Sequence, residues 1–128
     1  MMLTLALSGC GKEAELPPDL FPETVASVWR RGETRDLAVS EAPDPVPRNE
    51  VERLREAAYD GPGKLQARVY QLRSAAVGQE LSQRWRPSAD TVFFDAGRYF
   101  VVVKWQAADL KALREFLKAL QTKLRTSR

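Results

Sequence analysis

Apolar and polar residues alternate most regularly in the C-terminal half of the chain. Alternation over residues 65–72 predicts a strand with one apolar face. The segments 91–94 and 99–105 are rich in Val, Phe, Tyr and Trp, which favour strands. Between them, residues 95–98 include Gly97, which tolerates a positive φ. We therefore expect a tight hairpin to join the last two strands.

Two segments of the same half carry apolar residues at helical spacing. Ser74 is a favoured N-cap for a helix that ends near Trp85, with apolar residues at i, i+4 and i+8. From about Ala108 to Leu124, five leucines fall on one stripe of a second helix. Residues 65–124 are thus predicted to run β-α-β-β-α.

The N-terminal half gives weaker signals. Alternation over 33–40 predicts a strand, and three prolines within 42–47 predict a loop. Asn49 is a favoured N-cap, and the apolar residues behind it keep helical spacing. We expect a helix here that ends before the Asp-Gly-Pro-Gly sequence at 60–63.

These elements predict an α+β fold in which a small antiparallel sheet has its helices packed on one face. The ferredoxin-like topology is one arrangement of the C-terminal β-α-β-β-α order. The strand 99–105 is apolar on both faces, so the face that carries Phe100 and Val102 also needs a cover. Burial in the core is the ordinary interpretation, and an exposed patch that docks a partner is the alternative.

The N-terminus carries a motif with a specific chemistry. Leu7-Ser8-Gly9-Cys10, close behind an apolar stretch, resembles the lipobox of bacterial lipoproteins. In that family the cysteine thiol receives a diacylglyceryl group, and a peptidase cuts the chain just before the cysteine. The resemblance implies a signal-peptide remnant at 1–9 and lipidation of Cys10. The prolines and charges that follow predict a tether, so that residues 10–22 form the lipidated Cys and tether. The length of the remainder predicts a single α+β domain at 23–128.

Three observations bear on this resemblance. Cys10 is the only cysteine, so its lipidation would leave an exported domain without an unpaired thiol, which argues against a chance match in a cytosolic protein. No Lys or Arg precedes the apolar stretch, whereas signal peptides begin with a basic region, so we expect the true start codon upstream. Gly11 stands where aspartate signals retention in the inner membrane. The resemblance therefore implies a lipid-anchored protein of the outer membrane that faces the periplasm.

Part of the chain is also similar to a group of small bacterial lipoproteins of unknown function. The similarity covers about half of the chain and lies in Ala58-Tyr59-Asp60-Gly61, Val69-Tyr70, Gln83-Arg84-Trp85 and Phe94 to Val103. These motifs are structural, so the resemblance bears only on fold and compartment.

The formal net charge of +3 is distributed unevenly. Residues 1–64 carry 8 Lys+Arg and 12 Asp+Glu, a net charge of −4, whereas residues 65–128 carry 12 and 5, a net charge of +7. In an exported protein, such a basic half indicates an anionic lipid surface or an acidic partner rather than nucleic acid.

The last predicted helix concentrates basic residues on one side. Lys111, Arg114, Lys118 and Arg125 recur at spacings of 3, 4 and 7, opposite the leucines. We predict that these four residues bind a membrane surface or an envelope protein. A solvated helix face is the ordinary interpretation, and Glu115 is spaced to pair with Lys111.

The composition argues against most catalytic chemistry. The chain has no histidine, which removes the commonest general base and most zinc sites, and its glycines form no phosphate-binding loop. Asp90 and Asp95 bracket a predicted strand about 17 Å long, whereas glycosidase carboxylates lie about 5–9.5 Å apart.

We expect no catalytic residue, metal or cofactor, and a lipid-anchored envelope protein with a non-enzymatic binding or scaffolding domain. The alternative is a periplasmic domain that binds or hydrolyses a small ligand.

Overall fold

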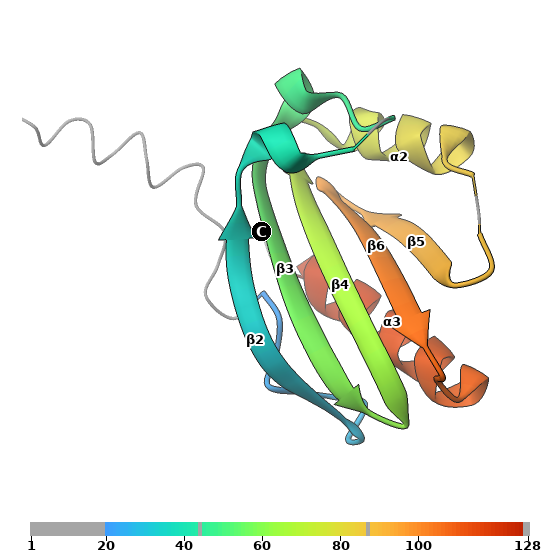
Figure 1. Cartoon of the computed structure of the whole chain (residues 1–128). Helices are drawn as coiled ribbons and strands as arrows, with labels where there is room; N and C mark the ends of the chain where they lie inside the picture. Colours follow the sequence, from blue (N-terminus) through green and yellow to red (C-terminus); the bar gives the residue numbers. More distant parts are fainter. Residues whose placement is uncertain (1–19, 44, 87, 127–128) are drawn as a thin grey trace, which may run out of the picture.

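A computed structural model describes residues 20–43, 45–86 and 88–126, which form one antiparallel sheet and two α-helices (Figure 1). The strands are β1 (Thr24–Val25), β2 (Trp29–Leu37), β3 (Val51–Gly61), β4 (Gly63–Leu72), β5 (Thr91–Ala96) and β6 (Tyr99–Gln106). Their order in the sheet is β1-β2-β3-β4-β6-β5. The helices are α2 (Ala75–Arg84) and α3 (Leu110–Thr126), and two short 3₁₀ turns, η1 (Val39–Glu41) and η2 (Arg48–Glu50), lie between β2 and β3.

The sheet curls into a half-barrel, and this corrects the predicted fold class. The strands contain more residues than the helices, and the expected ferredoxin-like arrangement with both helices on one face of a small sheet is wrong. Helix α3 packs against one face, which we call the inner face, and α2 contacts the opposite, outer face at one end (Figure 1).

The helices separate because the central strands are apolar on both faces. In β4, Ala67 and Val69 point to the inner face, whereas Tyr70 and Leu72 point to the outer face, and all four are buried. A strand that alternates between two apolar faces needs cover on both. The two helices together with the η1–η2 connection provide that cover.

The inner core joins all six strands to α3. Trp29 of β2 is fully buried, and its indole Nε1 donates a hydrogen bond of 3.0 Å to the carbonyl oxygen of Ala112 in α3. The ring of Phe116 lies edge-on to both Trp29 and Tyr59, with centroid distances of 6.0 and 4.9 Å. Such aromatic pairs contribute about 0.5–1.5 kcal/mol each beyond the area they bury. These contacts fix the orientation of α3 on the sheet.

The outer core is smaller and lies under α2. Leu81 of α2 is buried among residues of β3, β4 and β6, and the ring of Trp85 lies 5.3 Å from that of Phe100. Phe100 is fully buried and Val102 is half-buried against the same cluster. The alternative of an exposed docking patch at these two residues is therefore wrong.

The predicted helix after Asn49 is also wrong, because this segment forms β3. Its Arg, Glu, Leu and Ala residues favour helices locally, but β3 pairs along its length with β4, from Val51↔Leu72 to Gly61↔Gly63. A register shift between Val51 and Arg53 breaks the period-2 pattern that would have indicated a strand. Long-range pairing thus overrides local propensity.

The other elements follow the sequence more closely. The strand at 65–72, the hairpin at 95–98 and the helices at 74–85 and 108–124 are confirmed within two residues at most ends. The strand predicted at 33–40 begins earlier, at Trp29. Leu20 and Phe21, at the end of the predicted tether, are the residues expected to contact the core first, and both are buried in the inner core.

The turn between β3 and β4 is packed tightly against the start of α3. Gly63 has a φ of +134°, and a Cβ atom there would lie 2.4 Å from the Cα atom of Ala108. The carbonyl oxygen of Pro62 accepts a hydrogen bond of 2.9 Å from the backbone N–H of Asp109. This turn therefore sets the position at which α3 begins.

We predict that Gly63→Ala lowers the free energy of unfolding by about 3 kcal/mol or more, because strained backbone and a steric overlap add. Gly97→Ala is the matched control, since Gly97 has a φ of +60° but no neighbouring atom within 4 Å of an added Cβ. Its cost is the left-handed conformation alone, about 1–2 kcal/mol. Chemical denaturation measures both values, and equal losses would contradict the tight contact between the turn and α3.

Candidate functional site

The four predicted surface-binding residues all lie on the exposed side of α3. Lys111, Arg114, Lys118 and Arg125 are exposed, and at 3.6 residues per turn they fall within an arc of about 60°. The arc lies opposite the buried residues of the helix, which are Ala112, Leu113, Phe116, Leu120 and Leu124. We call the four cations the basic stripe, and it is about 21 Å long at a rise of 1.5 Å per residue.

No ion pair neutralises the basic stripe within the described part of the chain. The expected pair of Lys111 with Glu115 does not form, and the ion pairs of the described residues involve other side chains. A stripe of unpaired cations keeps its full charge available to an external anion.

The N-terminal end of the described chain lies on the same side of the sheet as α3. Phe21 packs edge-on against Tyr59 at a centroid distance of 6.3 Å, and Tyr59 in turn packs against Phe116 of α3. The Tyr59 hydroxyl donates a hydrogen bond of 2.6 Å to the carbonyl oxygen of Pro22. The point where the chain enters the domain is thus fixed beside α3. Cys10, the predicted lipidation site, lies outside the described residues.

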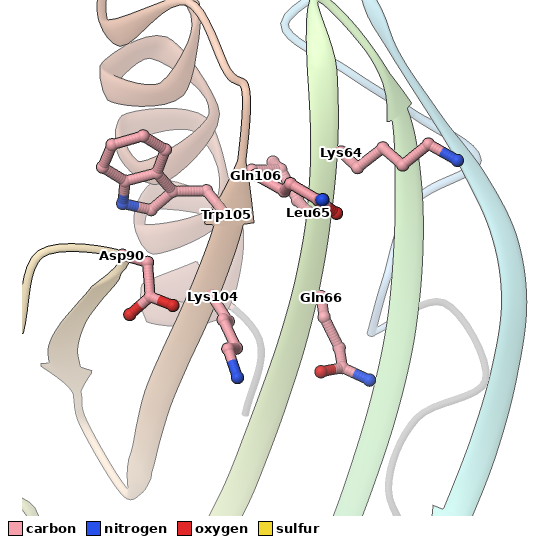
Figure 2. Close-up of a pocket in the computed structure, with 7 residues that line it drawn as sticks. All are labelled: Lys64, Leu65, Gln66, Asp90, Lys104, Trp105 and Gln106. Atoms are coloured by element: carbon pink, nitrogen blue, oxygen red, sulfur yellow. The ribbon is translucent and has the colours of Figure 1, made fainter.

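A second candidate is a hollow on the outer face, away from α2. Its polar lining comes from Lys64 and Gln66 of β4, Lys104 and Gln106 of β6, and Asp90, and its volume is about 470 Å³. Figure 2 shows Gln66 and Lys104 side by side across the two strands, with Trp105 and Asp90 on the β5 side.

This outer hollow offers binding groups but no paired carboxylates. Asp90 is its one carboxylate, and the hydroxyl of Thr91 donates a hydrogen bond of 3.0 Å to it. Asp95 lies at the other end of β5, where its carboxylate accepts a hydrogen bond of 2.7 Å from the Ser82 hydroxyl. The two aspartates therefore do not form a catalytic pair. Among the described residues, no group of three metal-ligating side chains comes together.

An ion network centred on the buried Glu56 crosses the outer face beside this hollow. The Glu56 carboxylate accepts one hydrogen bond from Arg35 and one from Arg68, each of 2.8 Å. Burial alone would raise the pKa of Glu56, but the two arginines outweigh it and hold that pKa below its usual value. Glu56 is therefore ionised and fully engaged, so its role is to stabilise the sheet.

A third candidate, the mouth cavity, opens beside the C-terminal end of α3. It has a volume of about 700 Å³, and its lining includes Gln71, Arg98, Tyr99, Leu124 and Arg125. Gln71 is 7% exposed, and its Oε1 atom is buried with no hydrogen-bond partner in the described residues. An unsatisfied buried polar group costs about 1–3 kcal/mol. A water molecule or a ligand group that reaches this oxygen would remove the cost.

Tyr99 adds a second polar group to the mouth cavity. It pairs with Gln71 across β4 and β6, so the two side chains share the inner face. Burial raises the pKa of Tyr99, which Arg98 partly opposes. The hydroxyl is therefore protonated at neutral pH and can donate a hydrogen bond.

Sequence reasoning found the basic stripe but missed the mouth cavity. The stripe follows from the period of one helix, whereas Gln71 and Arg125 come from elements that only the fold brings together. No local pattern around Gln71 signals a site. No protein-family model, curated protein or solved structure matches this chain.

We predict a pH-dependent contribution of Glu56 to stability. Because its pKa is lower in the folded protein than the ordinary value of 4.5, the contribution is complete above that pH and is lost as pH falls below it. At pH 7, Glu56→Gln should lower the free energy of unfolding by about 2 kcal/mol.

Denaturation of wild type and variant at several pH values checks this prediction. The exposed Glu80, whose ion pair with Arg84 has an N–O distance of 3.9 Å, provides the control, and Glu80→Gln should have almost no effect. A difference between wild type and Glu56→Gln that stays constant from pH 7 to well below the usual pKa would contradict the ionised network.

Proposed function

We propose that this chain is a lipid-anchored protein of the bacterial cell envelope whose domain docks, without catalysis, on an anionic phospholipid surface. Cys10 would carry the lipid, and the basic stripe of α3 would contact the headgroups. The proposal locates the protein at the outer membrane, facing the periplasm. The observation that carries it is the basic stripe, four exposed cations on one face of α3 that form no ion pair with any described residue.

The magnitude of the electrostatic attraction suits an auxiliary contact. A basic side chain near an anionic membrane contributes about 1 kcal/mol, so the stripe would supply about 4 kcal/mol. That alone gives weak and reversible binding. Two acyl chains on Cys10 would supply stable attachment, since each buried CH₂ contributes about 0.8 kcal/mol. The lipid would then set residence at the membrane, and the stripe would set the orientation.

The entry point of the chain supports the same orientation. Leu20 and Phe21 are buried on the inner face together with α3. The ten peptide units between Cys10 and Leu20 span at most about 35 Å. A tether that leaves the domain beside α3 favours approach of this side, rather than the outer face, to the bilayer. No described helix is long and apolar enough to cross a membrane.

A second candidate function is the binding of a small ligand. The specific observation in its favour is the unpartnered, buried Oε1 atom of Gln71 in the mouth cavity. The two functions are compatible because Arg125 belongs both to the basic stripe and to the lining of that cavity.

Reversal of two stripe charges tests the docking proposal. We predict that Lys111→Glu with Lys118→Glu, made in the full chain with Cys10→Ser so that no lipid contributes, weakens binding to phosphatidylglycerol-containing vesicles by at least about tenfold. Cosedimentation at about 10 mM salt, where the Debye length is about 30 Å, gives the measurement.

The matched control reverses Lys64 and Lys104, which are exposed on the outer face. This variant has the same net charge as the stripe variant, so it separates the position of the charges from their number. It should keep most of the vesicle affinity. Equal losses in the two variants, or no loss in the stripe variant, would overturn the proposal and leave an acidic protein as the partner of the stripe.

A further inference from the structure

Two polar groups that lack partners among the described residues line the mouth cavity: the amide oxygen of Gln71 and the guanidinium of Arg125. The buried amide oxygen of Gln71 accepts no hydrogen bond from any residue that the structure describes. Arg125 lines the same cavity, is exposed, and has no ion-pair partner among the described residues. A ligand that satisfies both groups must carry a hydrogen-bonding group and an anionic group.

Arg98 differs from Arg125 because it is already held in place. Its Nη2 atom pairs with the Glu52 carboxylate at 2.7 Å, and its Nε atom donates a hydrogen bond of 3.1 Å to the carbonyl oxygen of Leu72. Arg98 therefore shapes the wall of the cavity, and Arg125 is the cation available to an incoming anion.

A hydroxyl group fits Gln71 better than other polar groups. The amide end of glutamine presents one acceptor and one donor, and a hydroxyl both donates and accepts. It can therefore pair with the Gln71 amide in either orientation once a side-chain shift opens the buried amide oxygen to the cavity. An anion matches Arg125, whose planar guanidinium recognises phosphate oxygens in pairs. The buried side chains of Leu124 and Tyr99 offer apolar surface to a short carbon skeleton.

We propose that the mouth cavity binds a phosphate-bearing polyol, with a hydroxyl of the polyol on Gln71 and the phosphate on Arg125. This inference deepens the proposed function and rests on it for the source of the ligand. Because Arg125 ends the basic stripe, docking of α3 on a membrane would bring the cavity to the level of the headgroups. The glycerol phosphate headgroup of phosphatidylglycerol has this chemistry, and so does free glycerol phosphate.

The test compares three probes on the full chain. Vesicles of phosphatidylglycerol carry the hydroxyls, vesicles of phosphatidylmethanol carry the same charge without them, and glycerol 1-phosphate is the soluble probe. Wild type should bind phosphatidylglycerol about fivefold more tightly than phosphatidylmethanol, as expected for one net hydrogen bond. Gln71→Leu should remove this preference and leave binding to phosphatidylmethanol unchanged.

Two further variants complete the test. Gln66→Leu makes the same change at an exposed position of β4 on the outer face and should keep the preference. Arg125→Gln changes an exposed residue, so it tests the cavity even if Gln71→Leu proves unstable, and it should weaken binding of glycerol 1-phosphate severalfold.

The outcomes separate this inference from the docking proposal. If neither vesicle binds but glycerol 1-phosphate binds and Gln71→Leu abolishes that binding, the stripe proposal fails, the cavity proposal holds, and the source is a free metabolite. A vesicle preference that depends on Gln71 identifies the lipid headgroup as the source. Equal affinity of wild type for the two vesicles together with no binding of glycerol 1-phosphate overturns the inference. A preference that survives both Gln71→Leu and Arg125→Gln overturns it as well.

Discussion

The burial of the sheet on both faces is the constraint on which the rest of this structure depends. β4 and β6 carry apolar side chains in both directions, so neither face can be left to water along its whole length. With all strands antiparallel and one sheet only, the chain must supply two separate covers. Helix α3 covers the inner face, and α2 with the η1–η2 connection covers one end of the outer face. Burial of each large apolar side chain contributes about 1.5–3 kcal/mol, which far exceeds the helix propensity that β3 gives up.

The same constraint decides which surfaces remain for function. Because α3 gives one side to the inner core, its opposite side is exposed, and this side bears four cations. Because α2 reaches only one end of the outer face, the rest of that face is polar and is cross-linked by Glu56 with Arg35 and Arg68. The mouth cavity lies where α3 ends and β4 and β6 meet the hairpin, and there the Oε1 atom of Gln71 has no hydrogen-bond partner among the described residues. The two faces of the domain thus differ in chemistry: the side of α3 carries a row of four cations that form no ion pair with described residues, whereas the outer face combines the ion pairs of Glu56 with the exposed Lys64 and Lys104.

The sequence predicts those elements of the fold whose signal lies within a short stretch of residues, and it misses those that depend on long-range contacts. α3, β4 and the β5–β6 hairpin were predictable because each has a clear period or turn residue, and the faces of α3 followed from its leucines. β3 was not, because a register shift interrupts its alternation and its residues favour a helix. The placement of the helices on opposite faces was also missed, although the two-sided character of residues 99–105 was visible in the sequence. The mouth cavity could not be predicted, since Gln71 and Arg125 become neighbours only when the chain has folded.

We propose that the domain contacts the membrane through the exposed side of α3. The most direct measurement places a fluorescent probe on each side of the protein in a Cys10→Ser background. One probe is attached at Thr122→Cys, an exposed position of α3 beside the basic stripe, and the other at Gln66→Cys, an exposed position on the outer face. Quenching by lipids that carry a quencher near the headgroup is measured on phosphatidylglycerol vesicles. Docking through α3 predicts strong quenching of the probe at residue 122 and almost none at residue 66. Equal quenching at the two positions, or stronger quenching at residue 66, would contradict it.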